Sequence, residues 1–113
     1  MLQNAIGNDL AITLEFLRDF QSTASKIALE LTRACEHHEA LFAGQQAHKL
    51  MSSARAIGAT ALGALCAEIE TIGKAGNLEM LTALLPLFEQ EFDKVFATID
   101  ALLAKGIHYQ TEL

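Results

Sequence analysis

Tryptophan is absent from this sequence, and proline and cysteine are rare, with one proline and two cysteines in 113 residues. The scarcity of proline, together with abundant alanine and leucine, suits an all-α fold. Two cysteines in unrelated contexts do not make a disulfide framework, and we expect a reduced protein. The sequence also lacks a run of about 18 apolar residues, the length that a transmembrane helix needs.

Positive charge is also in short supply. Eight lysines and arginines stand against 14 acidic residues, which gives a net charge of −6. Nucleic acids and anionic membrane surfaces both select basic faces, so neither is an expected partner. Residues 1–10 lack the basic start and apolar core of a signal peptide. The simplest location for such a chain is the cytoplasm.

Apolar residues recur at three- and four-residue spacing through most of the chain, a pattern that predicts amphipathic helices. We expect a short helical lead-in that Gly7 interrupts, after which Asn8 or Asp9 caps a long helix that ends near Cys35. Further helices are predicted over about 40–57, 59–74 and 78–105. Glycine just past an apolar stripe ends a helix, as at Gly58.

The last predicted helix has a start signal and an internal breaker. Asn77 is suited to cap its first turn. Pro86 lies inside its pattern and predicts a kink or a short break near Leu84. The predicted buried stripe of the third helix is Ala61, Leu62, Leu65, Cys66, Ile69 and Ile72. That of the last is Leu81, Leu84 or Leu85, Phe88, Phe92, Val95 or Phe96, Ile99 and Leu102.

Four amphipathic helices with short connectors predict an antiparallel up-down-up-down four-helix bundle. At 113 residues the chain is long enough for one domain with a single core. We expect this core over about 8–105, with a polar tail over 106–113. The fold class is therefore all-α, with the N-terminal lead-in as its one addition.

One histidine stands out from the helical pattern of the second predicted helix. Each residue advances about 100° around a helix, so Ala47, Leu50, Ala54 and Ile57 share one apolar side with Ala43. His48 points roughly 140° away from the middle of that side, toward solvent. An exposed imidazole is thus expected among small and polar side chains, where a large partner can reach it.

The stretch around His48 resembles the signature of histidine-containing phosphotransfer (HPt) domains, roughly A-H-x-L-K-G-[SA]-[SA]-x-x-[LIV]-G-A followed by L-x-x-L-C-x-x-[LI]-E. The sequence departs from this pattern at Met51, where the family has lysine, and at Ser52, where it has glycine. The matching positions are Ala47-His48, Leu50, Ser53-Ala54, Ile57-Gly58-Ala59, Leu62, Leu65-Cys66 and Ile69-Glu70.

The resemblance implies a phosphorelay intermediate. His48 would accept a phosphoryl group on Nε2 from the aspartyl phosphate of a response-regulator receiver domain and pass it to another receiver. Such a domain is a stoichiometric carrier rather than an enzyme. It has no ATP or metal site of its own, and the receiver supplies the Mg²⁺. A hybrid sensor histidine kinase is the other expected partner.

Other side chains near His48 are candidates for supporting roles. Arg55, two turns on, is the stronger candidate for binding phosphoryl oxygens, while Lys49 reaches partway. Gln45 is a candidate donor of a hydrogen bond to the imidazole or the phosphoryl group, and the hydroxyl of Ser52 is a candidate for a hydrogen bond to the phosphoryl group. A docking patch for the partner is expected at Leu41, Gly44 and Met51.

Alternative functions remain open at this stage. The changes at Met51 and Ser52 motivate an HPt-shaped regulatory module that docks a receiver or kinase without carrying phosphate, and a general helical interaction domain is a third interpretation. Glu68 and Glu70 point to different faces of a helix and do not form an acid–base pair. The four polar residues Glu36 to Glu39 include two histidines, but adjacent ligands diverge and nothing nearby completes a metal site.

Overall fold

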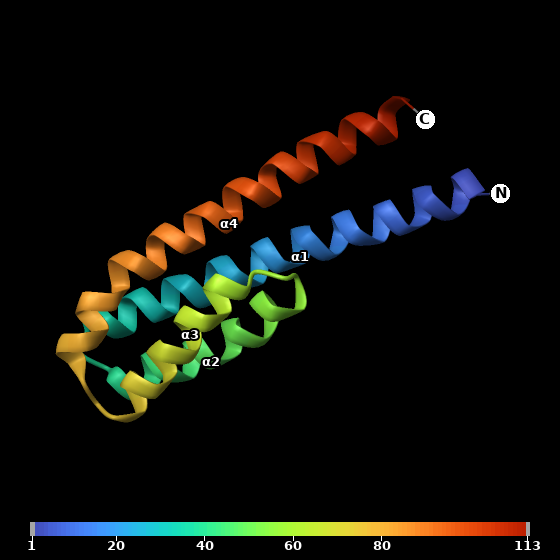
Figure 1. Ribbon diagram of the computed structural model, residues 1–113. Helices are drawn as coiled ribbons and strands as arrows, with labels where there is room; N and C mark the ends of the chain where they lie inside the picture. The colour runs from blue at the N-terminus through green and yellow to red at the C-terminus, as the bar shows by residue number, and fades with distance from the viewer. Residues whose placement is uncertain (1, 113) are drawn as a thin grey trace.

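The computed structural model describes the backbone of residues 2–112 and the side chains of residues 10–106. Over residues 2–112 the chain forms four α-helices joined by short turns: α1 (Leu2–Glu36), α2 (Ala40–Ala56), α3 (Thr60–Lys74) and α4 (Leu78–Glu112). Figure 1 shows the up-down-up-down arrangement expected from the sequence. The all-α four-helix bundle is thus confirmed.

The helices differ greatly in length, which gives the molecule an elongated shape of 55 × 19 × 18 Å. The outer helices α1 and α4 have 35 residues each, whereas α2 and α3 have 17 and 15. In Figure 1, α2 and α3 lie beside one half of the long pair, and the other half runs on beyond them. We call residues 2–16 of α1 and 102–112 of α4 the two-helix extension.

Several expected helix boundaries were wrong. α1 runs without interruption through Gly7, so neither Asn8 nor Asp9 starts it, and the lead-in is simply its first turns. α4 continues through the expected tail to Glu112, and Pro86 does not break it. Proline removes one backbone donor, and here the packing of Leu81 and Phe88 on either side keeps the helix in place.

The turns between the helices follow the local chemistry of the sequence. Gly58 and Gly76 have φ values of 82° and 71°, a left-handed conformation that residues with a Cβ adopt at a cost. The predicted cap at Asn77 is confirmed, because its side-chain oxygen accepts a hydrogen bond of 3.2 Å from the N–H of Met80. These turns set α2, α3 and α4 in their antiparallel order.

The core lies where all four helices meet and follows the predicted apolar stripes. Its largest fully buried side chains are Phe88, Leu31, Leu50, Leu62, Ile69, Leu81 and Cys66. Two stripe positions were wrong: Ala61 and Leu102 are exposed, and Leu103 packs inward in place of Leu102. Burial raises the pKa of Cys66 to about 12, as expected of a cysteine that acts as a small apolar core residue.

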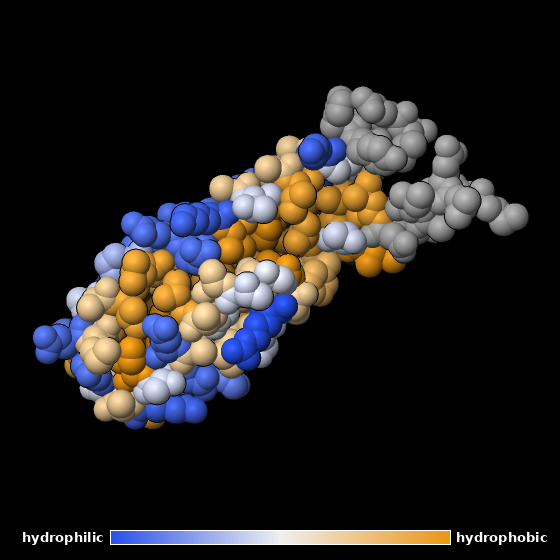
Figure 2. Space-filling model, in the orientation of Figure 1, coloured by the Kyte–Doolittle hydropathy of each residue, from blue (hydrophilic) through white to orange (hydrophobic). Residues whose placement is uncertain are grey.

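Hydrophobic surface, orange in Figure 2, runs from the four-helix part toward the two-helix extension, as far as the described side chains reach. Ile12 and Phe16 of the extension are more than half exposed. Leu14, in contrast, faces α4 and rests on Gly106, where a Cβ would lie 2.6 Å from its Cδ2. Within the described part of the chain, no helix combines the length and the apolar character needed to cross a bilayer.

Candidate functional site

A hydrogen bond at His48 connects the two inner helices. Its Nδ1 lies 2.8 Å from Oε2 of Glu70 on α3. An ionised carboxylate can only accept a hydrogen bond. Nδ1 therefore carries the proton and donates the hydrogen bond to Glu70. In the neutral ring the other nitrogen, Nε2, is then left with its lone pair. The side chain of His48 is 59% exposed and that of Glu70 only 16%, so the acceptor is fixed and the ring remains accessible.

Two glycines allow α2 and α3 to approach closely enough for this bond. A Cβ on Gly73 would lie 2.6 Å from the carbonyl oxygen of Ala40 and 2.8 Å from Cα of Gly44. A Cβ on Gly44 would lie 3.1 Å from the carbonyl oxygen of Glu70. The two backbones therefore touch about one turn before His48, and this contact sets the depth at which Glu70 stands beside the imidazole.

Glu70 also contacts a lysine. Nζ of Lys74 lies 3.2 Å from the same oxygen, Oε2 of Glu70, one turn further along α3. Two hydrogen bonds, the one from His48 with the larger effect and the one from Lys74 with the smaller, lower the pKa of the Glu70 carboxyl below its ordinary value. The folded state thus holds Glu70 ionised at neutral pH, and its stabilising contribution is lost as the pH falls through the lowered pKa.

A shallow pocket of about 400 Å³ surrounds these groups. Three of the expected site residues other than His48 line it: Leu41, Gln45 and Lys49. Leu41 is 58% exposed and its neighbour Phe42 is 37% exposed, so an apolar edge stands beside the imidazole. The remaining wall of the pocket comes from Phe42, Gln46, Glu70 and Lys74.

The other expected site residues lie outside this pocket. Arg55 packs over Gly63 of α3, where a Cβ would meet its Cγ at 3.1 Å. Ser52 lines a different pocket, together with Phe16 and Asp19 of α1. Met51 is half-buried against the core. Gly44 was expected in the exposed docking patch, and this was wrong, because Gly44 is buried. Its lack of a side chain lets α3 approach α2 closely.

Sequence reasoning did not assign functional roles to Glu70, Lys74 and Phe42. One signal was available, since Glu70 and Lys74 are four residues apart on one helix, the spacing of a favourable Glu–Lys pair. Their meeting with His48 depends on the crossing of α2 and α3, which a helical repeat does not encode. Glu70 therefore lies at a contact between two helices.

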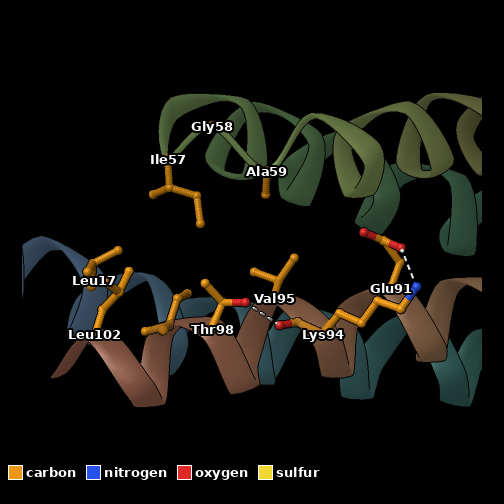
Figure 3. Close-up of a pocket in the computed structure, with 10 residues that line it drawn as sticks. Leu17, Ile57, Gly58, Ala59, Glu91, Lys94, Val95, Thr98 and Leu102 are labelled. Carbon is orange, nitrogen blue, oxygen red and sulfur yellow. Dashed lines mark hydrogen bonds and ion pairs between the residues drawn. The ribbon is translucent and has the colours of Figure 1, made fainter. Parts of the chain in front are cut away.

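Another pocket, of about 220 Å³, lies at the other end of the short helices, beside the α2–α3 turn. Figure 3 shows Ile57 and Ala59 pointing from the α2–α3 turn toward α1 and α4. Its two charged side chains, Glu91 and Lys94, pair with each other at 3.9 Å. No three His, Cys, Asp or Glu side chains within the described residues gather to hold a metal ion, Glu36 to Glu39 included.

The structure is thus an up-down-up-down helical bundle in which an exposed histidine on an inner helix pairs with a carboxylate. The Hpt domain family model matches residues 15–104 of this chain. The chain belongs to the Hpt domain family, as its sequence resemblance predicted. Hpt domains are phosphotransfer modules of two-component signalling that interact with receivers and histidine kinases. Comparisons with curated proteins and with solved structures gave no match.

Proposed function

We propose that this protein is a phosphorelay intermediate that carries a phosphoryl group on Nε2 of His48. One observation carries the proposal: the bond of 2.8 Å from Nδ1 to Glu70 directs the ring proton away from Nε2. The nitrogen that remains is a nucleophile on an exposed ring, beside an apolar edge where a partner can dock. Leu41 and Phe42 are the proposed contacts of that partner, with Gln45 and Lys49 nearer the phosphoryl group.

In the forward step, the lone pair of Nε2 attacks the phosphorus of a receiver aspartyl phosphate. The N–P bond forms, the P–O bond breaks, and the electron pair stays on the receiver carboxylate. Positive charge that develops on the imidazole is balanced by ionised Glu70 across the Nδ1–H bond. In the return step a second receiver carboxylate attacks phosphorus, and the N–P electron pair returns to Nε2.

This division of labour makes the protein a stoichiometric carrier rather than an enzyme. The chain provides the nucleophile, its orientation and the docking surface, and the Mg²⁺ is expected on the receiver. The expected partners are receivers and a hybrid sensor histidine kinase. The cytoplasmic location expected from the sequence stays a prediction.

The test is transfer from phosphorylated receiver domains to the purified protein in the presence of Mg²⁺. We expect an acid-labile, base-stable phosphate on this chain, a ³¹P resonance of an N-phosphorylated imidazole, and a phosphopeptide that contains His48. Receivers that bind the protein yet never transfer phosphate to it would overturn the proposal. That result would favour the alternative of a docking module that carries no phosphate.

Glu70 provides a further prediction for this mechanism. Replacing Glu70 by alanine removes the acceptor of Nδ1–H, so the ring is free to rotate and to place its proton on Nε2. We expect the rate of phosphotransfer to fall by about tenfold, as when a group that orients a histidine ligand is removed. The rate is measured from quenched time courses of phosphotransfer from one receiver at a fixed concentration.

Two variants control for the Glu70 result. Glu70→Gln keeps an oxygen that accepts from Nδ1–H but loses the charge, and should give an intermediate rate. Glu68→Ala removes an exposed carboxylate two residues earlier on α3 and should transfer at the wild-type rate. Equal losses in Glu68→Ala and Glu70→Ala would show that net charge, and not the bond to His48, controls transfer.

A further inference from the structure

One carboxylate oxygen holds both His48 and Lys74. Oε2 of Glu70 lies 2.8 Å from Nδ1 of His48 and 3.2 Å from Nζ of Lys74. The lysine is 66% exposed, and its stem is not fixed by burial. Its position is therefore set mainly by the negative charge of Glu70, and a stronger negative charge nearby would compete for it.

Loading His48 creates such a charge. A protein-bound phosphoryl group carries on the order of two negative charges near neutral pH. On Nε2 this group would lie across the imidazole ring from Glu70. The carboxyl of Glu70 is ionised, because its contacts with His48 and Lys74 lower its pKa. Two anionic groups would then share one small pocket, and repulsion between them would disfavour the loaded form unless a cation lies close to both.

Among the side chains that the structure describes, two lysines are the cations that line this pocket. Lys49 and Lys74 line it together with His48 and Glu70. Arg55 is packed over Gly63 of α3, and position 51 on the His48 helix carries an uncharged methionine that is half-buried. Of the two lysines, Lys74 is the one whose Nζ already sits in the network that begins at the imidazole.

We propose that Lys74 is a phosphoryl-binding residue, which contacts Glu70 when His48 is free and turns to the phosphoryl group when His48 is loaded. This rests on the proposed function, because it needs phosphate on Nε2. Lys74 thereby supplies a positive charge from α3, in addition to Lys49 of α2, at a site where position 51 of α2 carries an uncharged methionine. Its expected effect is to stabilise the phosphorylated form relative to the free one.

The test compares Lys74→Met with Lys74→Arg, which keeps the cation. Phosphoramidate, a small phosphoryl donor, loads His48 without any receiver, and ³¹P NMR then follows the ionisation of the phosphoryl group with pH. We expect this ionisation to move to higher pH in Lys74→Met, because a cation favours the dianion. Lys74→Arg should behave as the wild type. Lys49 and Glu70 face the same group and are unchanged in both variants.

A second measurement uses a receiver. At equilibrium with one phosphorylated receiver, the ratio of loaded to free protein should fall by about three- to tenfold in Lys74→Met, the range expected for one charge-assisted contact at a solvent-accessible site. The matched control is Lys94→Met, which removes a lysine paired with Glu91 on α4, outside the pocket. It should leave both the ratio and the ionisation unchanged.

The outcomes separate this inference from the proposed function. If His48 accepts phosphate and Lys74→Met matches the wild type in both measurements, the role of Lys74 is wrong and the carrier function stands. An equal change in Lys94→Met, or a Lys74→Arg variant that behaves like Lys74→Met, also overturns it. If receivers never load the protein, the carrier function fails, and the ionisation after phosphoramidate loading still tests Lys74.

Discussion

Replacing His48 by glutamine is expected to abolish phosphotransfer completely while leaving the fold intact. The amide nitrogen of glutamine has no available lone pair and does not attack phosphorus. Its N–H can still donate to Glu70, which keeps the link between α2 and α3 that His48 makes at 2.8 Å. Because the side chain at position 48 is mostly exposed, its replacement costs little core packing.

Phosphate on the wild-type protein and its absence on His48→Gln, with each receiver that transfers, is the measurement. Thermal unfolding of both proteins checks that the fold is kept. His37→Gln is the matched control, since His37 is an exposed histidine in the α1–α2 turn that does not line the pocket. Acid-labile phosphate on the His48→Gln variant would show that another histidine is the acceptor and would contradict the assignment.

Replacing Gly73 by alanine is expected to destabilise the folded protein by a net amount of about 2 kcal/mol. The added Cβ would overlap the backbone of α2 at both Ala40 and Gly44, and backbone cannot turn aside as a side chain does. Overpacking costs roughly 3 kcal/mol here, the upper end of its usual range, because three backbone atoms would lie within 3.0 Å of the new Cβ. The better helix propensity of alanine returns about 1 kcal/mol at most.

Denaturant titration measures this loss, which corresponds to a shift of roughly 30-fold in the folding equilibrium. Gly63→Ala is the matched control on the same helix, since its Cβ meets the flexible side chain of Arg55 at 3.1 Å and comes no closer than 3.9 Å to backbone, at the carbonyl oxygen of Met51. Gly44→Ala should fall between the two, with its nearest contact at 3.1 Å from the Glu70 carbonyl. Equal stabilities of Gly63→Ala and Gly73→Ala would show that the close approach of α2 and α3 is not a stability determinant.

The same substitution should disturb the site. If Gly73→Ala pushes α3 away from α2, Glu70 moves with it and the bond to Nδ1 lengthens. The ¹⁵N shifts of the imidazole report the proton on Nδ1, and they should change in Gly73→Ala but not in Gly63→Ala. Stability and ring orientation are thus coupled through one backbone contact.

Most of the fold was predictable from the spacing of apolar residues. Ala43, Ala47, Leu50 and Ala54 recur on one side of a helix, and each is fully buried. The same periodicity placed His48 on the outer side, where it is exposed. The helix ends at Gly58 and Asn77 were also predictable, because left-handed backbone and side-chain caps depend on local residue chemistry.

What the sequence could not provide was contact between helices. The bond from His48 to Glu70 joins residues that are 22 positions apart and depends on how closely α2 and α3 cross, which is set by Gly44 and Gly73. Arg55 seemed well placed by its spacing from His48, yet tertiary packing holds it over Gly63. Pro86 is unfavourable inside an isolated helix, and the buried side chains of Leu81 and Phe88 on either side of it outweigh that local preference.

The unequal helix lengths determine how the molecule can be tethered. Leu2 and Glu112 leave from the same end of the bundle (Figure 1), whereas the pocket at His48 is lined by Leu41 and Lys74, toward the opposite end. About 15 residues of α1 precede Leu17, where α1 meets the α2–α3 turn. At 1.5 Å per residue, a tether joined at Leu2 would lie roughly 20 Å from the four-helix part of the molecule. Immobilisation through either end, or insertion into a host protein through both, would leave the His48 face open to a protein as large as a receiver.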